Sequence, residues 1–373
     1  MANTVPRFIF TLTGVFLLFL SSLTYEVRRV EAFHVPTQRK AMNTWKTSPP
    51  FSKDPLEKSK INTKAQSIFP TRGGSIGTSM VKDPKSFSPD YPVDIPRISI
   101  TIACTVLTWF AQRQYSNVMA SSAMTLICSM CFDKRLGQAA FCGSFAGMGS
   151  IGLVPSWKYA LGLGTLTSIF FEYLIHNKNY YLGVGGRLGA TAFIASSIIA
   201  LLQRIPTGLS LSSLPTFSAL GAIMKTNTVW SMAVWHAVGS IATIVLREAG
   251  DNSRAADPVR ASAVIGLIAA LLVEDKSIAL ALYGGSFIGM SLPSRLIHGI
   301  IPGKGKADKP INVFGLLASF GIAGALGGVV HGVTIGLDWW SGGWGGKAGF
   351  CAFIGCLLFR GMSKMKESVL NLS

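Results

Sequence analysis

An internal repeat constrains the fold of this chain more than any other feature of its sequence. The residues GSFAGM at positions 143–148 return as GSFIGM at positions 285–290, and an Asp-Lys pair lies at the same distance before each copy. Farther along, GVGGRLG at 183–189 matches GWGGKAG at 343–349. The matched segments occur in the same order along the chain and lie far apart in it, so they indicate two copies of one structural unit.

The apolar composition predicts a polytopic membrane protein. Of the 373 residues, 49% are hydrophobic and 14% are charged, and the mean hydropathy is +0.43. Apolar runs close to the ~20 residues of a spanning helix alternate with short charged loops. About a third of the formal net charge of +17 lies on the first 96 residues and the rest lies on loops. Charge placed in this way is typical of topology signals, so we expect the lipid bilayer as a partner and no nucleic acid.

We expect an all-α fold of two five-helix repeats, with about ten transmembrane helices. The first membrane repeat covers residues 97–204, the second covers 227–362, and a C-terminal tail covers 363–373. The expected spans of the first repeat are 98–112, 117–132, 136–154, 157–175 and 186–203. Those of the second repeat are 228–247, 258–273, 277–293, 311–336 and 345–361.

The linker between the repeats, residues 205–226, decides how they are related. Its apolar but Ser-rich part, 208–224, contains Pro215 and either lies in the membrane interface, re-enters the membrane, or spans it. If it does not span, the two repeats are inverted; if it spans, they are parallel. Inversion places most of the Lys and Arg residues beyond residue 96 on one side of the membrane, as the positive-inside rule favours. We therefore expect inverted repeats.

The first 96 residues have the pattern of targeting sequences. An apolar stretch at 8–24 follows Arg7 and predicts a signal peptide, residues 1–32, cleaved after Ala32. Residues 33–96 are rich in Ser, Thr, Lys and Pro and are too polar to build a core. With Ala32-Phe33 and Pro36, the two parts resemble the bipartite presequence of plastid proteins in algae with secondary plastids. The resemblance implies a plastid membrane, envelope or thylakoid; an uncleaved signal anchor with a disordered tail, in the secretory pathway or plasma membrane, is the alternative.

Glycines spaced four residues apart predict close packing between helices, because such pairs let two backbones approach. The longest stripe occupies the fourth segment of the second repeat, where it forms one nearly side-chain-free face. The glycines expected to pack in this way are Gly143, Gly147, Gly285, Gly289, Gly185, Gly189, Gly345, Gly349, Gly324, Gly328, Gly332 and Gly336.

The first repeat carries polar residues where the second carries that glycine stripe. The counterparts of Gly328, Gly332 and Gly336 are Ser168, Glu172 and His176, and the last two are four residues apart on one helix face. An acid in a spanning segment is rare and indicates a proton or ion site facing the bundle interior. The position of Glu172 one turn from the segment end also allows it to reach lipid headgroups.

Four further residues are candidates for a substrate or ion pathway. His236 follows Trp230 and Trp235 in its segment, and His331 lies beside the glycine stripe. A lone histidine in a membrane helix more commonly hydrogen-bonds a neighbouring helix. Arg187 and Lys347 occupy equivalent places in the Gly-rich segments, where helix starts can receive an anionic group.

Sequence patterns of common enzymes are absent. The chain has no Walker-type nucleotide loop, zinc-protease helix, serine-nucleophile elbow or EF-hand loop. Cys128 and Cys131 have the spacing of a metal pair, but no second pair or nearby His completes a site, so packing is the better interpretation. We expect no cofactor, no metal and no enzymatic activity.

The architecture favours transport, by analogy with other proteins built from inverted repeats. We expect a transporter or channel for a small solute or ion, with its pathway at the interface of the two repeats. The alternative is a non-transporting membrane scaffold or assembly factor of a plastid complex, and an integral membrane enzyme comes third. A homo-oligomer is compatible with either of the first two.

Overall fold

The protein is all-helical over the residues that the computed structural model describes. These are residues 93–176, 181–203, 205, 217–248, 257–297, 313–340 and 344–370, and they contain no strand. The expected signal peptide and the transit-like segment up to residue 92 lie outside the described residues. Their processing and disorder therefore stay predictions.

A first group of helices corresponds closely to the spans expected for the first repeat. Asp94, Ser116 and Asp133 each accept a backbone N–H bond at the start of a helix, because a side-chain oxygen there satisfies an otherwise unpaired donor. The helices of this first group are α2 (Ile95–Ala111), α3 (Asn117–Cys131), α4 (Lys134–Gly147), α5 (Trp157–His176) and α6 (Arg187–Leu202).

The second group begins with a short helix and repeats the order of the first. Asp257 and Asp275 cap two of its helices in the same way. Its helices are α7 (Phe217–Met224), α8 (Asn227–Glu248), α9 (Pro258–Leu272), α10 (Lys276–Gly289), α11 (Pro293–Leu296), α12 (Val313–Gly336) and α13 (Lys347–Leu370).

Three of these helices are long and apolar enough to cross a membrane, which indicates a membrane protein. They are α8, α12 and the part of α13 from Lys347 to Met365. Helices such as α4 and α10, with 14 residues each, extend only about 21 Å, whereas a bilayer core is about 30 Å thick. The other helices are shorter or less apolar, and the expected ten spans stay a prediction. Helix α7 has 8 residues, and 208–216 of the linker lie outside the described residues.

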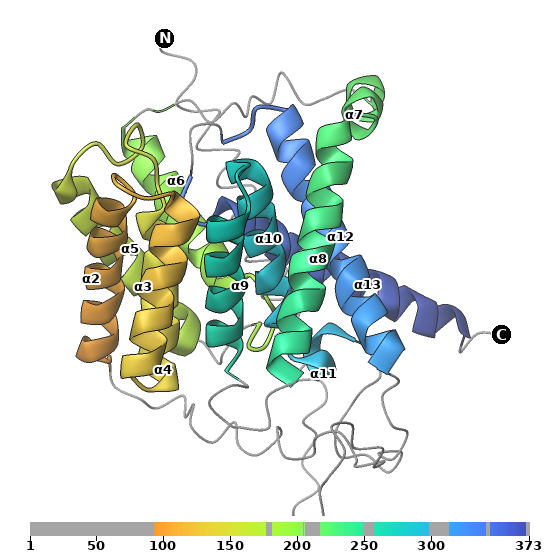
Figure 1. Cartoon of the computed structure of the whole chain (residues 1–373), viewed down its shortest axis with the longest axis horizontal. Helices are drawn as coiled ribbons and strands as arrows, with labels where there is room; N and C mark the ends of the chain where they lie inside the picture. Colours follow the sequence, from red (N-terminus) through yellow and green to blue (C-terminus); the bar gives the residue numbers. More distant parts are fainter. Residues whose placement is uncertain are drawn as a thin grey trace, which may run out of the picture.

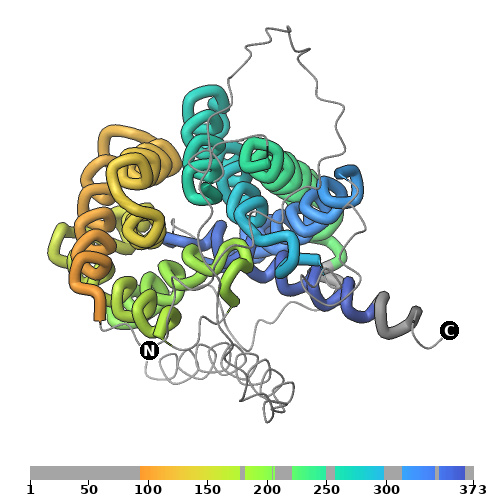
Figure 2. Tube along the Cα trace, turned by 90° about the horizontal axis from the view of Figure 1, so that it is seen from below, coloured from red at the N-terminus to blue at the C-terminus, as the bar shows by residue number. Residues whose placement is uncertain are grey.

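The two groups lie side by side and pack their helices in the same pattern. In the first group, α2 packs against α4 and α5, and α3 packs against α4. In the second group, α8 packs against α10 and α12, and α9 packs against α10. Figure 1 shows α9 at the edge of the second group, next to α3 of the first. In Figure 2, α13 starts against the first group and runs under the second toward the C-terminus.

Glycines bring equivalent helices into backbone contact in both groups. A Cβ atom added to Gly143 would lie 2.2 Å from the carbonyl oxygen of Thr101, and one added to Gly285 would lie 2.0 Å from that of His236. The α4–α2 and α10–α8 contacts are therefore made at the same place in the repeated motif. On α12, a Cβ at Gly328 would lie 2.3 Å from the carbonyl oxygen of Met232 on α8. No larger side chain fits at these positions unless the helices separate.

One end of the molecule is defined by ion pairs of the first group. Arg97, at the start of α2, binds Glu172, near the end of α5. Arg135, in the first turn of α4, lies 2.9 Å from Asp94, just before α2. The starts of α2 and α4 and the end of α5 therefore lie together, at what we call the Arg97 end.

The helices α4 and α10 run in opposite directions, although both carry the repeated motif. Arg260, in the first turn of α9, donates to the carbonyl of Ser129 near the end of α3, so α9 starts at the Arg97 end. The end of α9 and the start of α10 meet the start of α3 at the opposite end, which we call the Asn117 end. The turns at Asp133 and Asp275, which precede α4 and α10, consequently lie at opposite ends of the molecule.

Four aromatic rings fill the core where the two groups meet. The ring centroids of Phe145 and Phe287, which occupy equivalent positions in the motif, are 4.6 Å apart. The ring centroid of Phe141 lies 5.8 Å from that of Phe287, and that of Tyr283 lies 5.7 Å from that of Phe145, so the two cross-contacts have nearly equal separations. All four side chains are buried, and this core is closely packed.

Candidate functional site

Buried hydroxyl residues gather at the surface between α3 and α9, which we call the seam. Helix α3 carries Ser121, Ser122, Thr125 and Ser129, and all four side chains are buried. At 3.6 residues per turn, these positions lie along one side of the helix. The seam joins the first helix group to the second, because α3 belongs to one and α9 to the other.

Four hydroxyl groups beside the seam form hydrogen bonds with one another, and two more form a separate pair between α9 and α10. Ser121 Oγ lies 2.9 Å from Ser144 Oγ and 3.2 Å from the hydroxyl of Tyr283, which comes from the second helix group. Thr125 Oγ1 lies 2.9 Å from the same Ser144 oxygen. At the equivalent place in the second group, Ser262 Oγ lies 2.7 Å from Ser286 Oγ. We call the four linked side chains, Ser121, Thr125, Ser144 and Tyr283, the hydroxyl cluster.

The ring of Tyr283 closes the seam at its middle. A Cβ added to Gly266 on α9 would lie 2.5 Å from the Tyr283 ring and 3.1 Å from Cβ of Ser122. The absence of a side chain at Gly266 therefore makes room for the ring between the helices. Tyr283 is fully buried, so access to the hydroxyl cluster requires this ring or its neighbours to move.

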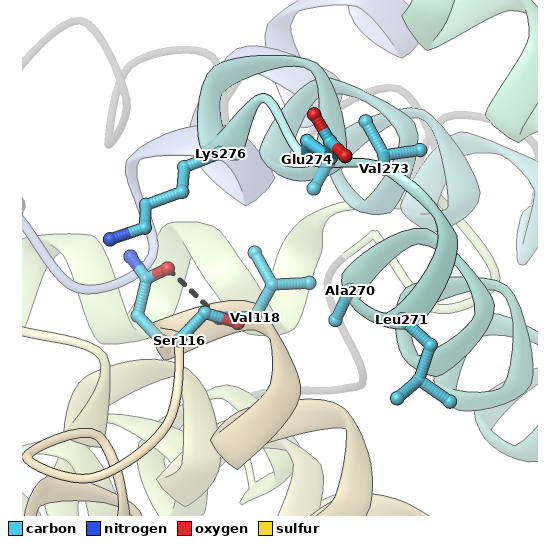
Figure 3. A pocket seen from close by; sticks show the side chains of 9 residues that line it. Ser116, Val118, Ala270, Leu271, Val273, Glu274 and Lys276 are labelled. Atoms are coloured by element: carbon cyan, nitrogen blue, oxygen red, sulfur yellow. Dashed lines mark hydrogen bonds between the residues drawn. The ribbon is translucent and has the colours of Figure 1, made fainter.

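A pocket of about 210 Å³ opens at the Asn117 end of the seam. In Figure 3, Val118 and Ala270 lie on opposite sides of this pocket, and Glu274 and Lys276 come from the turn before α10 and from its start. Ser122 follows Val118 by one helical turn on α3, so the pocket lies about one turn from the place where Ser122 faces Gly266 and the Tyr283 ring. The lining residues are Ser116, Asn117, Val118, Ala270, Leu271, Val273, Glu274, Lys276 and Ala279.

The other end of the seam is closed by Arg260. Its Nε donates to the carbonyl oxygen of Ser129 at 3.0 Å, and Nη2 of the same guanidinium donates to that oxygen as well. The carbonyl belongs to the last turn of α3, where backbone acceptors lack helical partners. The repeat register places Met119 at the position equivalent to Arg260. The two ends of the seam therefore differ: one holds an open pocket and the other a guanidinium.

Glu172 and His176 lie between α2 and α5, inside the first helix group and away from the seam. Arg97 Nε lies 2.5 Å from one carboxylate oxygen of Glu172, and Nη2 lies 2.6 Å from the other. His176 Nε2 lies 3.4 Å from Glu172. Arg97 and Glu172 are both buried, so the carboxylate is held by a two-pronged ion pair. Sequence reasoning missed Arg97, which follows Pro96 at the start of an apolar run and has the position of an ordinary boundary residue.

His236 and His331 form a second buried pair, between α8 and α12. His236 Nε2 lies 3.0 Å from His331 Nδ1, and both rings are almost completely buried. A Cβ at Gly284 would lie 2.6 Å from the His236 ring, so this glycine makes room for it. The pair joins helices within the second group and lies apart from Glu172 and His176.

The other predicted pathway residues lie at separate places. The Ser168 hydroxyl donates to the carbonyl of Thr165 in its own helix. Lys347 Nζ donates to the carbonyl of Trp339 at 2.6 Å, and Arg187 is buried at the start of α6. The structure therefore joins the predicted residues into two pairs rather than one site.

The Gly-rich segments meet where α6 and α13 start. Gly186 and Gly346 have φ angles of +78° and +82°, which favour glycine. A Cβ on Gly189 would lie 2.6 Å from Cα of Gly349, and a Cβ on Gly349 would lie 2.6 Å from Cα of Gly189. A Cβ on Gly185 would lie 2.1 Å from the carbonyl oxygen of Phe287 on α10. The segments thus hold the two helix groups together by backbone contact.

Sequence reasoning also missed the hydroxyl cluster. Ser and Thr are common in membrane helices and carry little signal there. The available signal was the spacing of four hydroxyl residues on one side of α3, together with the Ser of the repeated motif. Comparison of the chain with protein-family models, with curated proteins and with solved structures finds no match.

Proposed function

We propose that this protein is a membrane transporter or channel whose small solutes cross along the seam. The observation that carries the proposal is the hydroxyl cluster, which lies at the junction of the two helix groups between an open pocket and Arg260. Such a path has the polar lining, the entrance and the closed far end that a gated route needs. Hydroxyl groups both donate and accept hydrogen bonds, so they can replace water around a polar solute.

The same proposal includes two inverted five-helix repeats and about ten helices crossing the membrane. Equivalent residues make equivalent contacts, and α4 and α10 run in opposite directions. Helices of 14 to 17 residues can cross where neighbouring helices satisfy their ends and the bilayer thins locally. In this arrangement the seam lies near the axis that relates the repeats, as substrate sites do in other inverted-repeat folds.

The second candidate function is a membrane scaffold or assembly factor. The close packing of Phe141, Phe145, Tyr283 and Phe287 favours it, because a rigid junction suits a structural role. The two candidates differ in whether the purified protein moves any solute.

We further propose a plastid membrane as the location. The support is the presequence pattern around Ala32-Phe33 alone. Envelope and thylakoid membranes both fit this proposal, and the direction of transport is not part of it.

Permeation through vesicles that contain the purified protein tests the proposal. Vesicles with the protein should take up small solutes faster than protein-free vesicles. Arg260→Ala should increase the rate further, because it removes the group that closes one end of the seam. Arg295→Ala, which removes an exposed charge at α11, is the matched control and should leave the rate unchanged. Uptake equal to that of protein-free vesicles for all solutes tested would favour the scaffold.

A further inference from the structure

We propose that the seam takes small neutral solutes with hydrogen-bonding groups, rather than ions, and that the Tyr283 hydroxyl sets this specificity. This inference rests on the proposed function, since it names the substrate class of the same path. It is carried by the chemistry of the hydroxyl cluster and by the difference between Tyr283 and its repeat counterpart.

The hydroxyl cluster contains no carboxylate, ammonium or guanidinium group. Its members are satisfied by one another, as the 2.9 Å contacts from Ser144 to Ser121 and to Thr125 show. An ion that enters such a site loses its hydration and gains only neutral dipoles in a buried environment, which is strongly unfavourable. A neutral solute loses much less hydration free energy, because hydrogen bonds to the hydroxyl groups replace its hydrogen bonds to water.

Backbone carbonyls, which select ions in some channels, are largely occupied along the seam. The carbonyls of α3 and α9 accept bonds within their own helices, and that of Val118 also accepts the Ser122 hydroxyl at 2.7 Å. The carbonyl of Ser129, at the end of α3, accepts from Arg260. The side-chain hydroxyls are therefore the groups left to bind a solute.

The ends of the path also disfavour cations. The guanidinium of Arg260 lies at one end, where a cation would have to pass it. The pocket at the other end carries one charge of each sign, from Glu274 and Lys276. A neutral solute meets no electrostatic barrier at either end, although Arg260 must still move aside to let it pass.

Two members of the cluster differ between the repeats. The counterpart of Thr125 is Gly266, and Tyr283 is the differing member that reaches across the seam. The equivalent residue of the first repeat is Phe141, which has the same ring and is also buried. The fold therefore tolerates phenylalanine at this place in the motif. The hydroxyl of Tyr283 reaches across the seam to Ser121 at 3.2 Å, where a solute would replace that bond.

The size of the solute is limited by the close approach at Gly266. The ring of Tyr283 fills the space beside this glycine, and the pocket above the cluster holds about 210 Å³. Solutes of a few non-hydrogen atoms, such as urea or glycerol, match this space.

Light-scattering and conductance measurements on vesicles and bilayers with the purified protein test the inference. The probes are urea and glycerol as neutral solutes, and potassium chloride as the salt. We expect urea and glycerol uptake above that of protein-free vesicles and no salt current. Tyr283→Phe should reduce uptake by about 2- to 13-fold, the effect of one lost hydrogen bond. Tyr159→Phe, which removes an exposed hydroxyl from α5, is the control and should leave uptake unchanged.

Each outcome separates the inference from the function on which it rests. A salt current without uptake of neutral solutes would overturn the inference and leave a transport protein. No permeation of either kind would overturn both. Uptake unchanged by Tyr283→Phe would exclude this hydroxyl as the specificity group. If that variant does not fold by size-exclusion chromatography and circular dichroism, Ser121→Ala, which removes the partner of the Tyr283 hydroxyl, replaces it and should also lower uptake.

Discussion

Replacement of Gly285 by alanine should destabilise the protein, because the added methyl group has no space. Its Cβ would lie 2.0 Å from the carbonyl oxygen of His236 and 2.6 Å from that residue's Cα, whereas ordinary contacts begin at 3.4 Å. Helices α8 and α10 would have to separate locally by about 1.4 Å, the difference between 3.4 and 2.0 Å. Overpacking costs about 1–3 kcal/mol, and both atoms belong to backbone that cannot rotate away. Alanine returns about 0.5–1 kcal/mol as a better helix former, so a net loss of about 1 kcal/mol is expected.

Unfolding in mixed micelles, followed by circular dichroism over a series of denaturant concentrations, measures this loss. Gly162→Ala in α5 is the matched control, because no atom lies within 4 Å of the added Cβ. The control should be neutral or stabilised by about 0.5–1 kcal/mol. Gly143→Ala should resemble Gly285→Ala, since its Cβ would lie 2.2 Å from the carbonyl oxygen of Thr101. Equal stability of Gly285→Ala and Gly162→Ala would refute the close-packing argument.

Three further predictions concern the ion pair, the topology and the N-terminus. Glu172→Gln should lower the free energy of unfolding by about 3 kcal/mol, because it leaves the buried Arg97 with only the Asp94 carboxylate, 4.0 Å away. The variant Arg97→Met with Glu172→Leu should cost less, and chemical denaturation that ranks the double variant as the less stable would contradict this. Lys134→Cys and Lys276→Cys, each in a background without the exposed Cys131, should react with an impermeant thiol reagent from opposite sides of the membrane. Labelling of both from one side would exclude inverted repeats. Sequencing of the mature N-terminus should locate it at Phe33 or beyond, whereas an N-terminus at Met1 would remove the plastid proposal.

The positions of the helices follow from the sequence because apolar runs and capping residues act locally. Asp133 and Asp275 each stop one helix and cap the next, so the expected breaks correspond to the observed ones. The predicted helix lengths are too long where an apolar run continues past the end of the helix. The span expected at 136–154 includes residues beyond Gly147, where α4 ends.

The partners of buried groups could not be predicted, because they depend on which helices meet. Glu172 was conspicuous as a rare acid in an apolar segment, but its partner Arg97 is 75 residues earlier in the chain. The Tyr283 hydroxyl meets Ser121 across 162 residues, and neither residue is unusual by itself. His236 and His331 were each identified as candidates, yet their contact follows only from the packing of α8 against α12.

The central claim, that solutes cross along the seam, is tested most directly by blocking the pocket at its Asn117 end. In a background without the exposed Cys131, Ala270→Cys places a thiol in the pocket, and Gly152→Cys places one on an exposed turn at the same end. After complete reaction with a bulky water-soluble thiol reagent, uptake of urea should fall to the level of protein-free vesicles for Ala270→Cys and remain unchanged for Gly152→Cys. A reductant that removes the reagent should restore it. Uptake that persists through fully labelled Ala270→Cys would contradict a path along the seam.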